Sequence, residues 1–293
     1  MTTFQPTFPQ TQQQPLPTMY DLPSDNPEDP GLPDEFHDWQ PQLLSETFVP
    51  ATYPPEQVFT AKDLNLYYDS QNPRLYKRPD WFGSVGVPRL LEPGKGRLSY
   101  VVWQEGRAPM VVVELLSPNT QEEDQGETPR GLNIPSKWEV YETILRVPYY
   151  VVFNGIGNAL RLFKLEGGSY RELSVDPQES PIAAKLWIEE LQIGLGLWQG
   201  SFTGVERQWL RWYDVQGNWI LTPTERETRE RQRVQMEQQR AETAEQKAHM
   251  EQQRAEMAEQ RAHMEQQRAE MAEQKAERLA QLLRAQGINP DDI

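Results

Sequence analysis

One acidic residue stands in the most apolar run of the chain. Glu114 lies within residues 111–116 (VVVELL), whose composition predicts a strand that is covered on both faces. An unpaired carboxylate in such a strand costs several kcal/mol. Glu114 must therefore be paired with a cation, be protonated or bind a metal.

A second acidic residue could bind the same metal as Glu114. Asp80 lies in residues 77–82 (KRPDWF), at the start of or within another predicted strand. Two carboxylates on adjacent strands can hold Mg²⁺, a hard cation that prefers oxygen ligands and keeps several waters. Such a metal activates water for attack on a phosphodiester. The structural alternative is that Glu114 pairs with Arg107 or Lys137, and that Asp80 belongs to a Pro-Asp turn.

The amino-acid composition excludes the other common kinds of catalytic and metal-binding site. The chain has no cysteine, so a disulfide framework, a thiolate zinc site and a cysteine nucleophile are excluded. Its three histidines, His37, His249 and His263, are too scattered to form a multi-histidine metal site. No apolar run is long enough for a membrane helix, and the first residues do not resemble a signal peptide. We expect a cytoplasmic protein whose chemistry depends on carboxylates and lysine.

Composition also divides the chain into three parts. Residues 1–44 contain no Lys or Arg, carry seven acidic residues and are rich in Pro and Gln, which predicts a disordered arm. Residues 45–224 hold nearly all the Trp, Tyr, Val and Gly and form the one segment able to build a core. Residues 225–293 begin with a long stretch, 225–284, that has neither Pro nor Gly and predicts one long helix.

The sequence of residues 45–224 predicts the strands and the helix that would position the acidic residues. Apolar runs predict strands at 98–104, 110–116 and 149–153. Between the last two, residues 136–145 have apolar side chains at helical spacing, with Ser136 as the expected N-cap. Glu166-Gly-Gly168 predicts a hairpin turn. The result is a mixed α/β domain.

The predicted long helix is built from a repeat of 14 residues, or two heptads. Met236, Met250 and Met264 begin successive copies, and Met257 and Met271 fall midway, so a methionine seam would form if the helix supercoils. The other seam position carries glutamines, which bury little apolar surface. Two interpretations stay open: a coiled coil that makes an oligomer, and a solvated helix stabilised by propensity and by ion pairs along its surface.

The order of motifs in the middle part resembles the Uma2 family of proposed endonucleases, within the PD-(D/E)XK restriction endonuclease-like superfamily. The resemblance spans about residues 56–198 and depends on Pro79-Asp80, on the VVELLSP strand at 112–118, on Lys137 with Tyr141, and on the PYYVVF strand at 148–153. It implies a mixed central sheet flanked by helices.

The same resemblance implies a set of roles. Asp80 and Glu114 would be metal ligands, with the Leu115 carbonyl as a third, and Mg²⁺ or Mn²⁺ would be the metal. The superfamily lysine usually stands two residues after the glutamate, where this chain has Leu116. Lys137, at the start of the next helix, would take its catalytic role beside Asp80 and Glu114. DNA would be the substrate.

The net charge of the chain bears on whether DNA would be the substrate. The formal net charge is −15, which is unfavourable for binding a phosphate backbone, although the arm accounts for about half of it. Eight basic residues precede Glu114 and could form a basic rim around the metal: Lys62, Arg74, Lys77, Arg78, Arg89, Lys95, Arg97 and Arg107. Two hypotheses follow: a metal-dependent DNA endonuclease, and a catalytically inactive scaffold that assembles through the C-terminal helix.

Overall fold

The computed structural model describes residues 32–117, 124–127, 134–155, 157–173, 185–285 and 287. The chain divides into two compact units, Met1–Pro223 and Thr224–Ile293. Within the described ranges, no helix combines the length and the apolar composition that crossing a membrane requires.

A six-stranded mixed sheet forms the centre of the first unit, in the order β1-β4-β6-β7-β8-β9. Its strands are β1 (Val58–Lys62), β4 (Trp81–Val85), β6 (Val111–Leu115), β7 (Tyr149–Asn154), β8 (Ala159–Glu166) and β9 (Ser169–Glu172). Only β6 and β7 pair in parallel; the other neighbours are antiparallel. All five residues of β6 are buried, as expected for a central strand.

Two smaller sheets flank the central one. Strands β10 (Lys185–Ile188), β11 (Ile193–Phe202) and β12 (Val205–Tyr213) form an antiparallel sheet. Short strands β2 (Leu66–Tyr67), β3 (Tyr76–Lys77) and β5 (Tyr100–Val101) form the third sheet. A 3₁₀ turn, η1 (Pro55–Gln57), precedes β1. These smaller sheets help to cover both faces of the central sheet.

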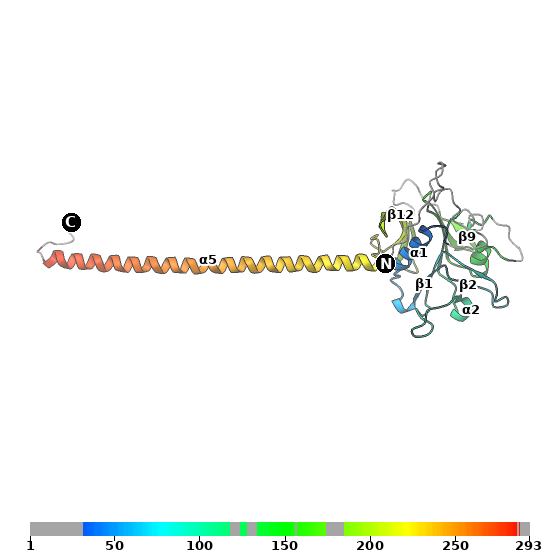
Figure 1. The fold of residues 1–293 in the computed structure, drawn as a ribbon, viewed down its shortest axis with the longest axis horizontal. Helices are drawn as coiled ribbons and strands as arrows, with labels where there is room; N and C mark the ends of the chain where they lie inside the picture. The colour runs from blue at the N-terminus through cyan, green and yellow to red at the C-terminus, as the bar shows by residue number, and fades with distance from the viewer. Residues whose placement is uncertain are drawn as a thin grey trace, which may run out of the picture. The chain divides into compact units, whose positions relative to one another are not determined.

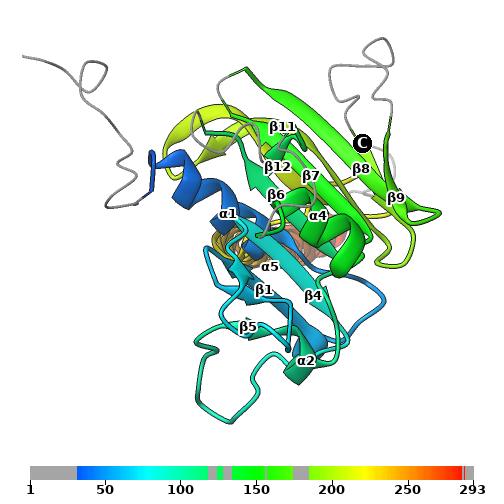
Figure 2. The same cartoon turned by 90° about the vertical axis from the view of Figure 1, so that its right-hand side faces the viewer.

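Each face of the central sheet has its own core. Val111, Val113 and Leu115 of β6 share one core with helix α1 (Phe36–Thr47) and the β10–β12 sheet. Val112 belongs to the other core, together with the helical segment α4 (Lys137–Glu139) and η2 (Val140–Ile144). Figure 2 shows α1 and α4 on opposite sides of this sheet. Because side chains alternate along a strand, Glu114 faces the α4–η2 side.

Helix α1 corrects the predicted extent of the N-terminal arm. The arm was expected to be disordered through residue 44, but residues 36–44 belong to α1, and Leu43 and Leu44 are fully buried. The Gln40 side chain exchanges two hydrogen bonds of 2.9 Å with the backbone of Leu210. Apolar side chains at helical spacing therefore outweigh the acidic composition here. Residues 1–31 lie outside the described part of the chain.

The strand predicted at 98–104 is wrong for most of its length. Only Tyr100 and Val101 are extended, in β5, and the next four residues form the helical turn α2 (Val102–Glu105). Gly106 ends this turn in the left-handed conformation with a φ of 71°. An apolar run as short as this does not distinguish a strand from a helical turn.

Residues 137–144, which lie between β6 and β7, are helical, as predicted. Ser136 is the N-cap, and its hydroxyl accepts a hydrogen bond from the Glu139 backbone N–H at 3.2 Å. The α-helical turn α4 continues directly into the π-helical turn η2. The hairpin of β8 and β9 also forms, with Gly167 and Gly168 both at positive φ.

Within the described residues, the second unit is one long helix followed by Gly287 in a turn. Helix α5 (Pro223–Ala285) runs without a break (Figure 1). It has 63 residues, and none of them is buried. It confirms the predicted helix over 225–284. Pro223 is its first residue, a position where the missing N–H of proline has no cost.

Candidate active site at the end of strand β6

Glu114 lies at the centre of a buried polar cluster. Its side chain is completely inaccessible to solvent. The Tyr141 hydroxyl donates a hydrogen bond to Oε1 at 2.9 Å, and the Lys137 ammonium donates to Oε2 at 3.0 Å. Residues 137 and 141 are one helical turn apart, so α4–η2 presents both side chains to one carboxylate. The carboxylate is therefore paired and not isolated in the core.

Asp80 lies next to Glu114, as the sequence predicted. It immediately precedes β4, the antiparallel neighbour of β6. Its backbone N–H lies 3.3 Å from Oε2 of Glu114, and its own Oδ2 accepts a hydrogen bond of 2.6 Å from the backbone N–H of Leu115. The two acidic residues thus converge at the carboxyl end of β6.

Asp124 joins the cluster from the segment after β6. It is fully buried, and its Oδ1 lies 2.8 Å from the Lys137 ammonium. Its backbone carbonyl accepts a hydrogen bond from the Tyr150 hydroxyl at 2.8 Å. The structure therefore places Asp124 in the site. Lys137 therefore bridges Glu114 and Asp124.

The electrostatics of the cluster follow from burial and from an excess of negative charge. Burial raises the pKa of Glu114 well above its usual value, Lys137 opposes this, and the charges of Asp124 and Asp80 reinforce it. Burial alone would lower the pKa of Lys137, but the three carboxylates outweigh it and raise that pKa. The ammonium is therefore firmly protonated.

This charge balance suits a bound cation. One ammonium faces three carboxylates, so the cluster holds more negative than positive charge in a buried place. Within the described ranges, no group of three or more His, Asp or Glu side chains converges on one point as a metal cage does. The oxygen atoms that could hold a divalent cation together with water are those of the Asp80 and Glu114 carboxylates and the Leu115 carbonyl.

His37 is a residue of this site that the sequence interpretation missed. It lies on α1 with 7% of its surface exposed, and its Nε2 is 3.3 Å from the carbonyl oxygen of Leu115. Its Nδ1 is 2.7 Å from Oδ1 of Asp34. Burial tends to lower the pKa of His37, but the hydrogen bond and charge of Asp34 raise it overall. One sequence feature could have indicated this role of His37. Asp34, an acidic residue, stands three positions before the histidine at the start of an amphipathic run.

The predicted basic rim forms only in part. Lys62 forms an ion pair with Asp38, and Arg78 lies 3.6 Å from Asp63, whose backbone N–H contacts the Asp80 carbonyl. Arg97 instead forms a buried ion pair with Glu105 at 2.6 Å. Basic side chains near the site are thus fewer than the sequence suggested.

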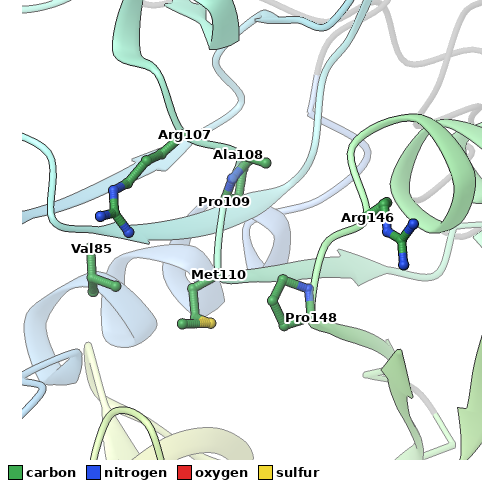
Figure 3. A pocket seen from close by; sticks show the side chains of 7 residues that line it. All are labelled: Val85, Arg107, Ala108, Pro109, Met110, Arg146 and Pro148. Atoms are coloured by element: carbon green, nitrogen blue, oxygen red, sulfur yellow. The ribbon is translucent and has the colours of Figure 1, made fainter. Parts of the chain in front are cut away.

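Arg107 lies at the opposite end of β6 from Glu114. It lines a pocket of about 230 Å³ with Met110 and Pro148, the residues that precede β6 and β7 (Figure 3). Arg146 lines the same pocket. Two ion-pair partners were considered for Glu114. The structure pairs Glu114 with Lys137 and not with Arg107.

A mixed sheet with an acidic pair at the end of a central strand is the arrangement of a restriction endonuclease-like protein, and here a lysine from the next helix lies beside the pair. The family comparison agrees. The Uma2 family model, described as "putative restriction endonuclease", matches residues 8–196, and the chain belongs to this family. The match begins earlier than the resemblance at 56–198 and includes α1 with His37. A search of curated proteins gave no match.

Proposed function

We propose that this protein is a Mg²⁺-dependent endonuclease that hydrolyses phosphodiester bonds in DNA. The observation that carries the proposal is the convergence of Asp80, Glu114 and Lys137 at the end of β6. Membership of the Uma2 family supports a nuclease in general. We also propose a cytoplasmic location, which the cysteine-free composition supports.

The residues that would hold the metal are the Asp80 and Glu114 carboxylates and the Leu115 carbonyl. A divalent metal there would supply Lewis acidity toward the phosphodiester and would activate the attacking water. Mn²⁺ has the same preference for oxygen ligands and would substitute for Mg²⁺. Asp80 is fixed for this role by its contact with the Leu115 N–H at 2.6 Å.

Lys137 would act through its fixed positive charge. The negative charge of a phosphoryl group grows as it is attacked, and a preorganised ammonium in a site of low polarity stabilises that charge. Asp124 holds the ammonium at 2.8 Å, and Tyr141 fixes the Glu114 carboxylate from the other side. Asp124 and Tyr141 are therefore positioning residues.

The test uses the full-length chain and supercoiled plasmid DNA with Mg²⁺, and with Mn²⁺ in parallel. We expect nicking or linearisation that EDTA stops, and a loss of at least about 100-fold in Asp80→Asn and Glu114→Gln, as is usual when a metal ligand or charge-stabilising group is removed. Glu92→Gln, which alters an exposed ion pair with Lys95, is the matched control and should keep full activity. No cleavage by the wild type, together with no heat of Mg²⁺ binding in calorimetry, would refute the proposal.

The second candidate is an endonuclease-like scaffold without catalysis, assembled as an oligomer through α5. The observation that favours it is that Lys137 already forms ion pairs with both Glu114 and Asp124 in the buried cluster. Such a network can serve stability or specificity of folding alone. Calorimetry separates the two candidates, because the scaffold predicts that Mg²⁺ releases no heat with either the wild type or Glu114→Gln.

A further inference from the structure

Helix α5 carries an ordered pattern of apolar and charged side chains that contacts nothing in a single chain. None of its 63 residues is buried, and its methionines are at least half exposed, from 53% in Met250 to 64% in Met271. Isolated methionines on a surface cost little, but these recur at every seventh or fourteenth residue from 236 to 271. An apolar residue at every seventh position is the a-position half of the coiled-coil pattern.

The charges beside the methionine seam are sorted by sign. With each methionine taken as heptad position a, with Thr243 taking that position in the first copy, position e is basic in every heptad: Arg240, Lys247, Arg254, Arg261, Arg268 and Lys275. Position g is acidic or histidine in every heptad: Glu242, His249, Glu256, His263, Glu270 and Glu277. A merely solvated helix has no need to place a basic residue at e in all six heptads and an acidic residue at g in four of them.

The basic charges at position e form no ion pair within the described residues of the helix. Arg231 pairs with Glu227 and Arg233 pairs with Glu230, both before the repeat begins. Between residues 236 and 277, all of which the structure describes, the side-chain contacts join glutamines to Glu or His, as in Gln252 with Glu256. The basic residues at e therefore remain available to a partner.

We propose that α5 pairs with α5 of a second copy of this chain as a parallel, in-register, two-stranded coiled coil. In that arrangement a residue at g faces the residue at e′ five positions later in the other chain. Glu242 then faces Lys247 of the second copy, Glu256 faces Arg261, and Glu270 faces Lys275. The symmetry of the dimer makes each of these pairs twice.

The same pattern rejects an antiparallel pair. In an antiparallel coiled coil, g faces g′ and e faces e′. Glutamates would then face glutamates and arginines would face arginines along the seam, and like charges at such positions are destabilising. The second copy must therefore point the same way as the first.

The seam itself makes the dimer moderate in strength and specific in register. Methionine fills position a, whereas glutamine occupies position d in Gln239, Gln253 and Gln267 and gains little from burial. Polar residues in a coiled-coil seam lower stability but fix register and strand number. The six heptads span about 63 Å at 1.5 Å per residue, and Arg278 at the next a position ends the seam.

This inference does not depend on nuclease activity, since it uses only α5. If the proposed nuclease is also correct, each particle has two active sites, whose chains enter the coiled coil from the same end.

The first experiment measures the mass of the full-length chain by light scattering over a range of concentrations. We expect a concentration-dependent approach to twice the 34.1 kDa of one chain. A basic variant, E242K/E256K/E270K, and an acidic variant, K247E/R261E/K275E, should each dimerise at least 10-fold more weakly, about 1.4 kcal/mol. Their mixture should restore the dimer, because the altered charges are complementary again.

The control for charge and helicity is E245K/E259K/E273K, which makes the same changes at heptad position c, away from the seam. It should dimerise as the wild type does, and circular dichroism should show equal helix content in all variants. A wild type of single-chain mass, a mass of three or more chains, or basic and acidic variants that dimerise as tightly as the wild type would overturn the proposal.

Orientation is tested with cysteines, since the chain has none of its own. M236C and M271C are prepared as separate full-length variants, mixed and mildly oxidised, and the cross-linked peptides are identified by mass spectrometry. A parallel dimer joins residue 236 to 236 and 271 to 271. Cross-links that join 236 to 271 would show an antiparallel pair and would overturn the orientation.

Discussion

The Tyr141 hydroxyl lies 2.9 Å from Oε1 of Glu114, so the helical segment α4–η2 is joined to the central strand β6 at the acidic residue. Both groups are fully buried. Since an ionised carboxylate accepts hydrogen bonds from every side, this contact and that of Lys137 determine which way the carboxylate faces. The geometry of the site therefore depends on a helix and a strand that are 27 residues apart in sequence.

Tyr141→Phe should therefore damage the site without removing any charge. The change leaves Oε1 of Glu114 buried without its hydroxyl donor, and we expect a loss of about 1–3 kcal/mol in the free energy of unfolding. Urea denaturation measures it. Tyr76→Phe, at a half-exposed position in β3, is the control and should change stability little. Equal stability of Tyr141→Phe and the wild type would show that the contact does not hold the carboxylate.

Lys137→Met should destabilise the protein strongly. Glu114 and Asp124 would remain buried without the ammonium that pairs with both, and breaking a buried ion pair by removing one partner typically costs about 3–5 kcal/mol. A second change, Asp124→Asn in the Lys137→Met background, should recover part of the loss because it removes one of the unpaired charges. Strictly additive effects in this double-mutant cycle would contradict the bridging role of Lys137.

The stability of the metal-free protein should depend on pH through Glu114. Burial raises the pKa of Glu114 in the folded state above the value of 4.5 in the unfolded chain. Its contribution to stability is therefore complete below pH 4.5 and is lost as the pH rises through the folded-state pKa. In EDTA, Glu114→Gln should thus gain stability relative to the wild type between about pH 4.5 and the folded-state pKa. Parallel stability curves for the two proteins across that range would contradict the shift.

His37→Ala should weaken the attachment of α1 to the site. The imidazole connects the Leu115 carbonyl at 3.3 Å with Asp34 at 2.7 Å, and its removal leaves a gap between α1 and β6. We expect a loss of about 1–3 kcal/mol in the free energy of unfolding and weaker Mg²⁺ binding in calorimetry. Asp34→Asn keeps the imidazole and should have a smaller effect on both. Unchanged Mg²⁺ affinity in His37→Ala would show that the Leu115 carbonyl needs no support from α1.

The sequence by itself determined the features that depend on local pattern. A carboxylate in an apolar strand marked Glu114, the motif order shared with the Uma2 family marked Lys137 and Tyr141, and the absence of Pro and Gly marked α5. These features can be predicted from the sequence because strand alternation and helical periodicity relate residues that are close along the chain.

Only the tertiary structure decided which distant groups meet. His37 lies 78 residues from Leu115, and Gln40 lies 170 residues from Leu210, yet both pairs are in contact. It also decided that Glu114 pairs with Lys137, whereas Arg107 lies at the far end of the same strand. No local pattern encodes these contacts, because they arise where separate elements pack to bury their apolar faces, and burial then selects the polar partners.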